Sequence, residues 1–132
     1  MASIFTKIID GNIPSYKIAE DDACYAFLDI NPAAKGHTLV IPKKETDYLF
    51  NLEPDELSGL TLFAQKVACG IDRALQPIRT GLIVEGMEVP HAHIHLIPIY
   101  KPSQNFSLGK KTDLDENQMK ELARRIREEV RL

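Results

Sequence analysis

The chain has few of the features that would place it among secreted, membrane or nucleic-acid-binding proteins. It holds only two cysteines, Cys24 and Cys69, whose spacing suggests neither a disulfide framework nor a metal clip, so we expect the reducing cytoplasm. No apolar run approaches the length of a membrane span, and the amino terminus lacks the apolar core and cleavage site of a signal peptide. The net charge of −3 gives no footprint for nucleic acid or membranes. We therefore expect neither as a partner, whereas a small anionic ligand held by local groups fits this charge.

The chain also lacks internal repeats, low-complexity segments and linkers. Its 132 residues suffice for one domain with a sizeable core, and its content of 44% hydrophobic and 27% charged residues is ordinary for a globular protein. We therefore expect a single domain over residues 1–132.

Side-chain periodicity and turn residues predict an α+β domain. Pro54 followed by Asp55 and Glu56 suits the start of a helix, because proline needs no N–H there and acids complement the helix dipole. A helical apolar stripe continues from there, and a second one lies near the carboxyl end. The expected strands are 16–20, 24–28, 37–41, 81–84 and 89–99, and the expected helices are 54–76 and 115–130. Hairpin-like links between most strands favour a five-stranded antiparallel sheet with two main helices.

Histidine is scarce, yet three of the four histidines fall within PHAHIHLIP, residues 90–98. In a strand, successive side chains alternate between faces, so His91, His93 and His95 would share one face. Ala92, Ile94 and Leu96 would pack on the other face. The spacing therefore predicts a ladder of imidazoles on a strand.

Three uses of this ladder are open. A purely structural role is weak, because three imidazoles on one face cost desolvation unless partners satisfy them. A metal site is the second, since histidine is a common ligand, although parallel neighbours on a strand do not readily converge on one ion. The third is nucleophilic catalysis by a neutral imidazole that its neighbours orient and assist. The spacing favours catalysis over a metal site.

The stretch HAHIHLIP resembles the signature of the histidine triad (HIT) family, and SIFTKIIDGNIPSYKIAEDDACYAFLDINPAAKGHTLVIPKKE resembles that family's amino-terminal half. The resemblance implies a HIT-like α+β fold, a homodimer that joins two five-stranded sheets, and attack on the α-phosphorus of a small nucleotide substrate. By this likeness His93 is the nucleophile, His91 and His95 steady the phosphate and leaving group, and His37 is an additional histidine beside the triad. No metal or cofactor is needed if neighbouring N–H groups stabilise the phosphoryl oxygens.

The resemblance also implies a nucleoside site. Asp29 matches a ribose-binding carboxylate, which can accept hydrogen bonds from both ribose hydroxyls. Without the likeness, Asp29 reads equally well as a turn residue, and the matching apolar residues as core. The apolar residues that match the base cleft are Ile4, Phe5, Ile8, Phe27 and Ile30.

Two departures from the family pattern stand out. Many bacterial members bind zinc through Cys-x-x-Cys, a histidine after PK and the first triad histidine, but Ser3, Thr6 and Glu45 stand at the first three positions, so we expect no zinc. Glu45 either lies within reach of His91, whose N–H it can accept, or is simply exposed.

The second departure is the pair Met87 and Glu88, where many members carry glutamine and a hydroxyl residue. Glu88 either points away from the site or faces it and serves the substrate as a general acid. We expect a HIT-type hydrolase or transferase acting on a nucleoside phosphoramidate or a dinucleoside polyphosphate. A catalytically weak nucleotide-binding regulator and a metal-dependent enzyme are the alternatives.

Overall fold

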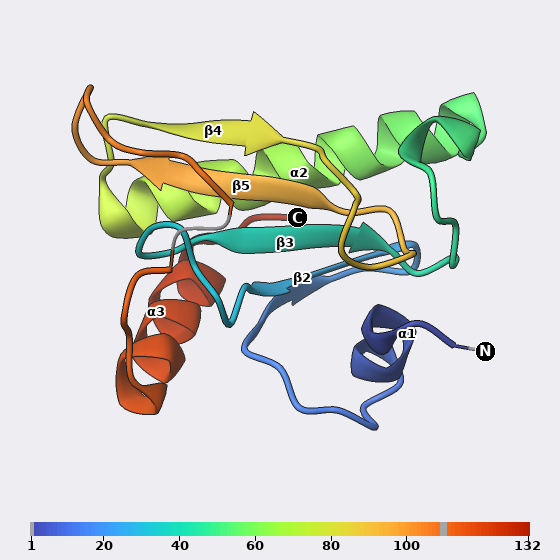
Figure 1. Ribbon diagram of the computed structural model, residues 1–132, viewed down its shortest axis with the longest axis horizontal. Helices are drawn as coiled ribbons and strands as arrows, with labels where there is room; N and C mark the ends of the chain where they lie inside the picture. Colours follow the sequence, from blue (N-terminus) through green and yellow to red (C-terminus); the bar gives the residue numbers. More distant parts are fainter. Residues whose placement is uncertain (1, 109–110) are drawn as a thin grey trace.

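The computed structural model describes residues 2–108 and 111–132 (Figure 1). In chain order its elements are α1 Ile4–Ile9, β1 Lys17–Glu20, β2 Cys24–Leu28, β3 Thr38–Pro42, the 3-10 helix η1 Leu49–Asn51, α2 Pro54–Leu75, β4 Arg79–Ile83, β5 Ile94–Ile99 and α3 Glu116–Glu129. Among these residues, no helix combines the length and apolar character needed to cross a bilayer.

The strands form one antiparallel sheet in the order β1-β2-β3-β5-β4. Strand β5 lies between β3 and β4, with His95 opposite Leu39 and Ile83. The predicted five-stranded α+β fold is confirmed, with a short α1 in addition to the two main helices.

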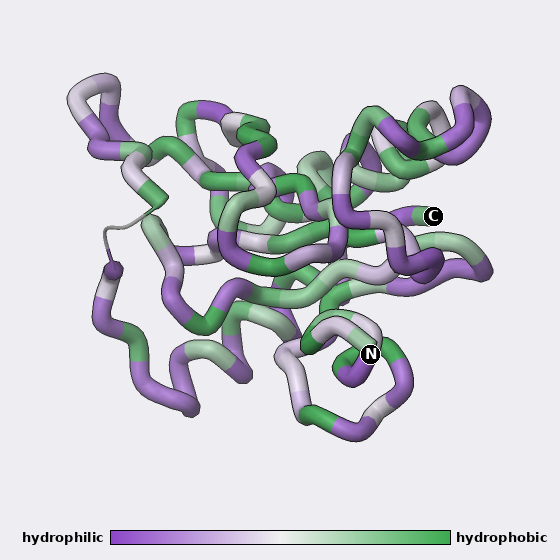
Figure 2. Tube along the Cα trace, turned by 45° about the vertical axis from the view of Figure 1, so that its right-hand side comes forward, coloured by the Kyte–Doolittle hydropathy of each residue, from purple (hydrophilic) through white to green (hydrophobic). Residues whose placement is uncertain are grey.

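The two faces of the sheet have different covers (Figure 1). Helices α2 and α3 pack on one face, whose core includes Val40, Ile94 and Leu96. Helix α1 packs on the other face, where Phe5 joins Phe27 and other residues of β2 and β3. Figure 2 shows hydrophobic residues concentrated in the central strands and hydrophilic residues in the peripheral loops.

The main helices begin as predicted, each with a capping box. Glu53 and Glu56 form the box of α2, and Asp115 and Gln118 that of α3. A Cβ atom at Gly70 of α2 would lie 2.6 Å from the Val130 side chain, so glycine permits the close approach of the segment after α3.

The predicted strand over 89–99 is too long, because β5 starts only at Ile94. Pro90 has no N–H, and the amide of Ala92 donates instead to the Thr46 carbonyl at 2.6 Å. The segment before Ile94 therefore does not form the hydrogen bonds of the sheet. Strand β4 begins two residues earlier than predicted, and the other main elements deviate by about one residue at their ends.

Candidate active site

The three histidines of the ladder are buried on the sheet face that α1 covers. Their exposed fractions are 0% for His91, 3% for His93 and 5% for His95. Ala92, Ile94 and Leu96 lie in the opposite core, so the predicted alternation is present although only His95 belongs to β5. The rings of His93 and His95 meet edge to face, 4.9 Å between centroids.

The tautomer of His93 follows from its partner. Its Nδ1 lies 2.7 Å from the carbonyl oxygen of His91, which can only accept, so Nδ1 carries a proton. In the neutral ring, Nε2 then has a free lone pair. The ring edge of Phe5 packs against His93, with centroids 5.2 Å apart, and limits its rotation.

His37 and His95 form a directed chain of hydrogen bonds. The amide of Ala33 donates to His37 Nδ1 at 2.9 Å, so His37 Nε2 carries the proton and donates to His95 Nδ1, also at 2.9 Å. Consequently His95 Nε2 carries a proton. Burial, with the neighbouring histidine, lowers the pKa of His37 to about 3 and that of His95 to about 4, so both rings are neutral near pH 7.

His91 uses both ring nitrogens to hold itself in place. Nε2 donates to the carbonyl of Pro42 at 2.7 Å, and Nδ1 therefore accepts from the hydroxyl of Ser3 at 2.8 Å. Desolvation lowers the pKa of His91, which favours this neutral form. His91 thus has no ring nitrogen left for a ligand.

Glu45 joins the same cluster without contacting His91. One of its oxygens accepts from the Ser3 amide at 2.5 Å and from the Thr6 hydroxyl at 2.7 Å. These bonds, led by that from Ser3, lower the pKa of Glu45 to about 2. Glu45 is exposed, as the second sequence-based alternative has it, and it is linked to His91 through Ser3, which bonds to both residues. We call Ser3, Thr6, Glu45 and His91 the Ser3 cluster.

A cavity of about 200 Å³, here the α1 cavity, opens beside His93 and His95. Asp29 lines it, accepts from the Asn31 amide at 2.8 Å, and has a raised pKa because of burial and the nearby Glu88. Glu88 is exposed and lines the same cavity. The apolar residues named from the sequence also line it: Ile4, Phe5, Ile8, Phe27 and Ile30. His37 and His91 are not among its lining residues.

A second cavity of about 380 Å³, here the aromatic cavity, also reaches His93. Tyr48 and Phe50 form an edge-to-face pair in it, 5.5 Å between centroids. Asp47 and Glu85 contribute carboxylates, and Val84, Gly86, Met87 and Ala92 are further lining residues. No sequence pattern marks this cavity, because the short irregular segment around η1 has no periodicity that distinguishes its exposed aromatic residues.

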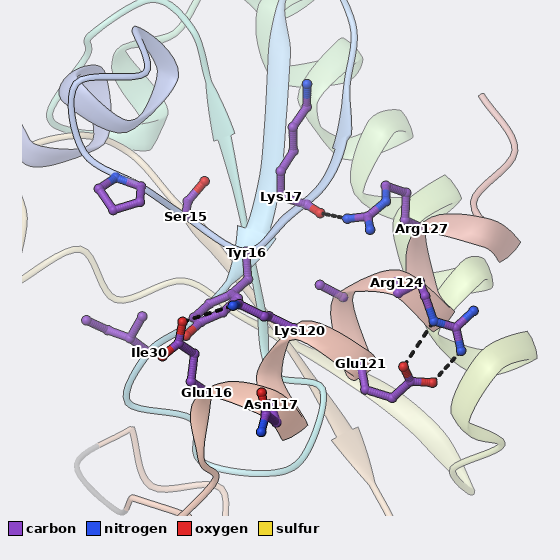
Figure 3. Close-up of a pocket in the computed structure, with 12 residues that line it drawn as sticks. Ser15, Tyr16, Lys17, Ile30, Glu116, Asn117, Lys120, Glu121, Arg124 and Arg127 are labelled. Carbon is purple, nitrogen blue, oxygen red and sulfur yellow. Dashed lines mark hydrogen bonds and ion pairs between the residues drawn. The ribbon is translucent and has the colours of Figure 1, made fainter.

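A larger groove, of about 820 Å³, lies between residues 14–17 and α3 (Figure 3). Its charges are largely neutralised within the protein: Glu116 pairs with Lys120, Glu121 pairs with Arg124, and Arg127 donates to a backbone carbonyl. No histidine lines it. Size alone therefore does not mark the reactive site.

One group of side chains in the described parts of the chain has metal-ligand spacing. The ligand atoms of Asp29, His37 and His95 lie within 4.8 Å of one another. Of the three triad histidines, this group contains only His95. His37 Nε2 and His95 Nδ1 are already joined to each other by a hydrogen bond, so an ion would have to break it.

Fold and site together define a small α+β protein with buried histidines beside a cavity that apolar residues and two carboxylates line. The HIT domain profile matches residues 10–102. An uncharacterized HIT-like protein of Borreliella burgdorferi is 38% identical over 131 residues, covering 93% of this chain and 94% of the relative. The chain therefore belongs to the HIT family.

Two further relatives bear on the site. The adenosine 5'-monophosphoramidase hnt1 of Schizosaccharomyces pombe is 35% identical over 114 residues, covering 83% of this chain and 81% of the relative. The crystal structure of a Zn-bound histidine triad family protein from Mycobacterium smegmatis has a TM-score of 0.83 and 27% identity, covering 98% of this chain and 94% of that one. The likeness thus extends to a named phosphoramidase and to a zinc-bound member.

Proposed function

We propose that this protein hydrolyses nucleoside phosphoramidates through a nucleotidyl-histidine intermediate on His93. The main support for this proposal is that His93 Nε2 has a lone pair beside the N–H of His95 at the edge of the α1 cavity. Every buried side-chain nitrogen and oxygen of the described residues has a hydrogen-bond partner. The two unpaired nitrogens, His93 Nε2 and His95 Nε2, are therefore not fully buried, and both residues line the α1 cavity.

The reaction has two displacement steps. His93 Nε2 attacks the α-phosphorus, the P–N bond to the leaving amine breaks, and the amine takes up a proton from water. The ring then bears a positive charge, which the His91 carbonyl stabilises through the Nδ1 proton. The His95 N–H donates to the phosphoryl oxygens. Water next attacks phosphorus and breaks the P–Nε2 bond, and the proton that this water loses neutralises the hydroxide left by the first step. Neutral His93 is restored and the nucleoside monophosphate is released.

The α1 cavity supplies the nucleoside site in this proposal. Its apolar residues take the base, and the Asp29 carboxylate accepts hydrogen bonds from the ribose hydroxyls. The named activity of the fission-yeast relative supports a phosphoramidate as substrate.

We further propose a homodimer joined along β4. This strand pairs with β5 on one side only, and its other edge is open in the described chain. Leu82 is 53% exposed and Ile78, just before β4, is 58% exposed, so a second copy would bury apolar surface as well as the strand edge. Both thiols are free, which fits the cytoplasmic location we propose.

The test is loss of the intermediate. His93→Ala is expected to lose nucleotidylation, read by intact-protein mass spectrometry, and to reduce turnover by several orders of magnitude while the circular dichroism spectrum is unchanged. Wild-type protein that binds nucleotide but forms no adduct and turns over no phosphoramidate would instead support the regulatory alternative. Substantial turnover by His93→Ala would exclude His93 as the nucleophile.

A further inference from the structure

In the part of the chain that the structure describes, the two cavities that His93 lines are rich in acidic groups. Asp29 and Glu88 line the α1 cavity, and Asp47 and Glu85 line the aromatic cavity. Among residues 2–108 and 111–132, no lysine or arginine lines either one. Lys43 and Lys44, which precede Asp47 in the sequence, pair with Glu20 and Glu56. The site is therefore unusually electronegative for one that receives a phosphate.

The position of the nucleoside decides which cavity remains for the leaving group. The phosphorus must lie within reach of His93 Nε2, and in the proposed function the nucleoside fills the α1 cavity. The substituent that leaves phosphorus then extends toward the aromatic cavity, which also reaches His93. That cavity offers the faces of Tyr48 and Phe50 together with two carboxylates. Aromatic faces and carboxylates both attract organic cations.

We propose that the aromatic cavity binds the leaving group and selects an organic amine that carries an additional positive charge. Asp47 and Glu85 bind the distal ammonium, while Tyr48 and Phe50 cover its carbon chain. A polyphosphate leaving group, as in a dinucleoside polyphosphate, meets only like charge there. This inference rests on the proposed phosphoramidase activity and names its substrate class.

A matched substrate series tests the inference on the wild-type protein. Three adenosine 5'-phosphoramidates are compared whose leaving amines have the same chain length and end in a methyl, an ammonium or a carboxylate group. We expect kcat/KM to be highest for the ammonium and lowest for the carboxylate, with about tenfold between these two at low salt, decreasing in 0.5 M NaCl. Diadenosine tetraphosphate is expected to be slower than all three.

Variants locate the preference. Asp47→Asn/Glu85→Gln is expected to remove most of the ammonium-to-carboxylate ratio of kcat/KM. Asp22→Asn/Asp113→Asn is the control, because it neutralises two exposed carboxylates that line neither cavity and changes the net charge equally. Equal ratios in these two variants would overturn the assignment of Asp47 and Glu85.

The readouts separate the two proposals. If the methyl-tailed substrate turns over but the three tails do not differ, or the carboxylate is preferred, the leaving-group inference is wrong and the phosphoramidase proposal stands. If none turns over, the phosphoramidase proposal is wrong. Calorimetric Kd values of the same three compounds then test the charge preference alone, and equal values overturn it.

Discussion

Replacing Ser3 by alanine tests whether the Ser3 cluster holds the histidine triad. The Ser3 hydroxyl caps α1 by accepting from the Thr6 amide at 3.0 Å, and it donates to His91 Nδ1 at 2.8 Å. Ser3 is itself buried and His91 is fully buried, so water does not readily replace the lost hydroxyl.

Both lost interactions contribute to the expected free-energy change. Loss of a helix cap costs about 1 kcal/mol. A buried acceptor without a partner costs about 1–3 kcal/mol. We therefore expect Ser3→Ala to lower the free energy of unfolding by about 2–4 kcal/mol. We also expect turnover to fall. Without the Ser3 hydroxyl, His91 is expected to shift, and its carbonyl group is the one that accepts the proton of His93 Nδ1.

Urea unfolding measures the stability change, and kcat and KM are measured on the folded variant. Ser58→Ala is the control, because Ser58 is exposed on α2 and is expected to change stability by no more than about 0.5 kcal/mol. Ser3→Thr keeps the hydroxyl and is expected to recover most of the loss. We expect a fall in kcat with KM little changed, since the cluster does not line the α1 cavity. A Ser3→Ala protein as stable and active as Ser58→Ala would refute a positioning role for the cluster.

Two further predictions concern pH and assembly. His37 and His95 have lowered pKa values in the folded state, so the unfolded chain binds more protons below its histidine pKa near 6.5. The free energy of unfolding should therefore fall as the pH drops from 6.5 toward 4, by about 1.4 kcal/mol per pH unit for each histidine. Urea unfolding at pH 7, 6 and 5 measures this change, and a free energy that does not vary with pH would contradict the prediction. Sedimentation should give a mass twice 14.8 kDa, and Leu82→Glu at the open β4 edge should yield monomers; a wild-type monomer across micromolar concentrations would count against the dimer.

The fold was predictable because local signals agreed with one another. Proline and acids started α2, alternating side chains marked most strands, and turn residues separated them. The exception is β5, where alternation begins at His91 but hydrogen-bonded pairing begins at Ile94. Alternation of side chains indicates an extended backbone and which face each side chain occupies. It does not indicate whether a neighbouring strand forms hydrogen bonds with that backbone. Helix α1 has six residues, too few for a helical period to be recognised.

The site was predictable only as far as side-chain type and alternation reach. The ladder identified three buried histidines on one face, and the family resemblance added His37, Asp29 and the apolar residues. The partners that assign roles come from distant segments: the Pro42 carbonyl and Ser3 hold His91, and the Ala33 amide orients His37. Such contacts depend on tertiary structure, which no spacing in the sequence encodes. For the same reason the resemblance alone did not separate His91, whose nitrogens are occupied, from His95.

The hydrogen bonds of the four histidines leave little freedom in how the site can act. Of their eight ring nitrogens, six are engaged within the described residues: both in His37, both in His91, and Nδ1 in His93 and in His95. His93 Nε2 remains with a lone pair and His95 Nε2 with a proton. A nucleophile and a hydrogen-bond donor on adjacent same-face residues, with ring centroids 4.9 Å apart, suit attack on a phosphorus whose oxygens need stabilisation. Because backbone groups fix the proton positions on His37, His91 and His93, the division of roles that we propose follows from these hydrogen bonds.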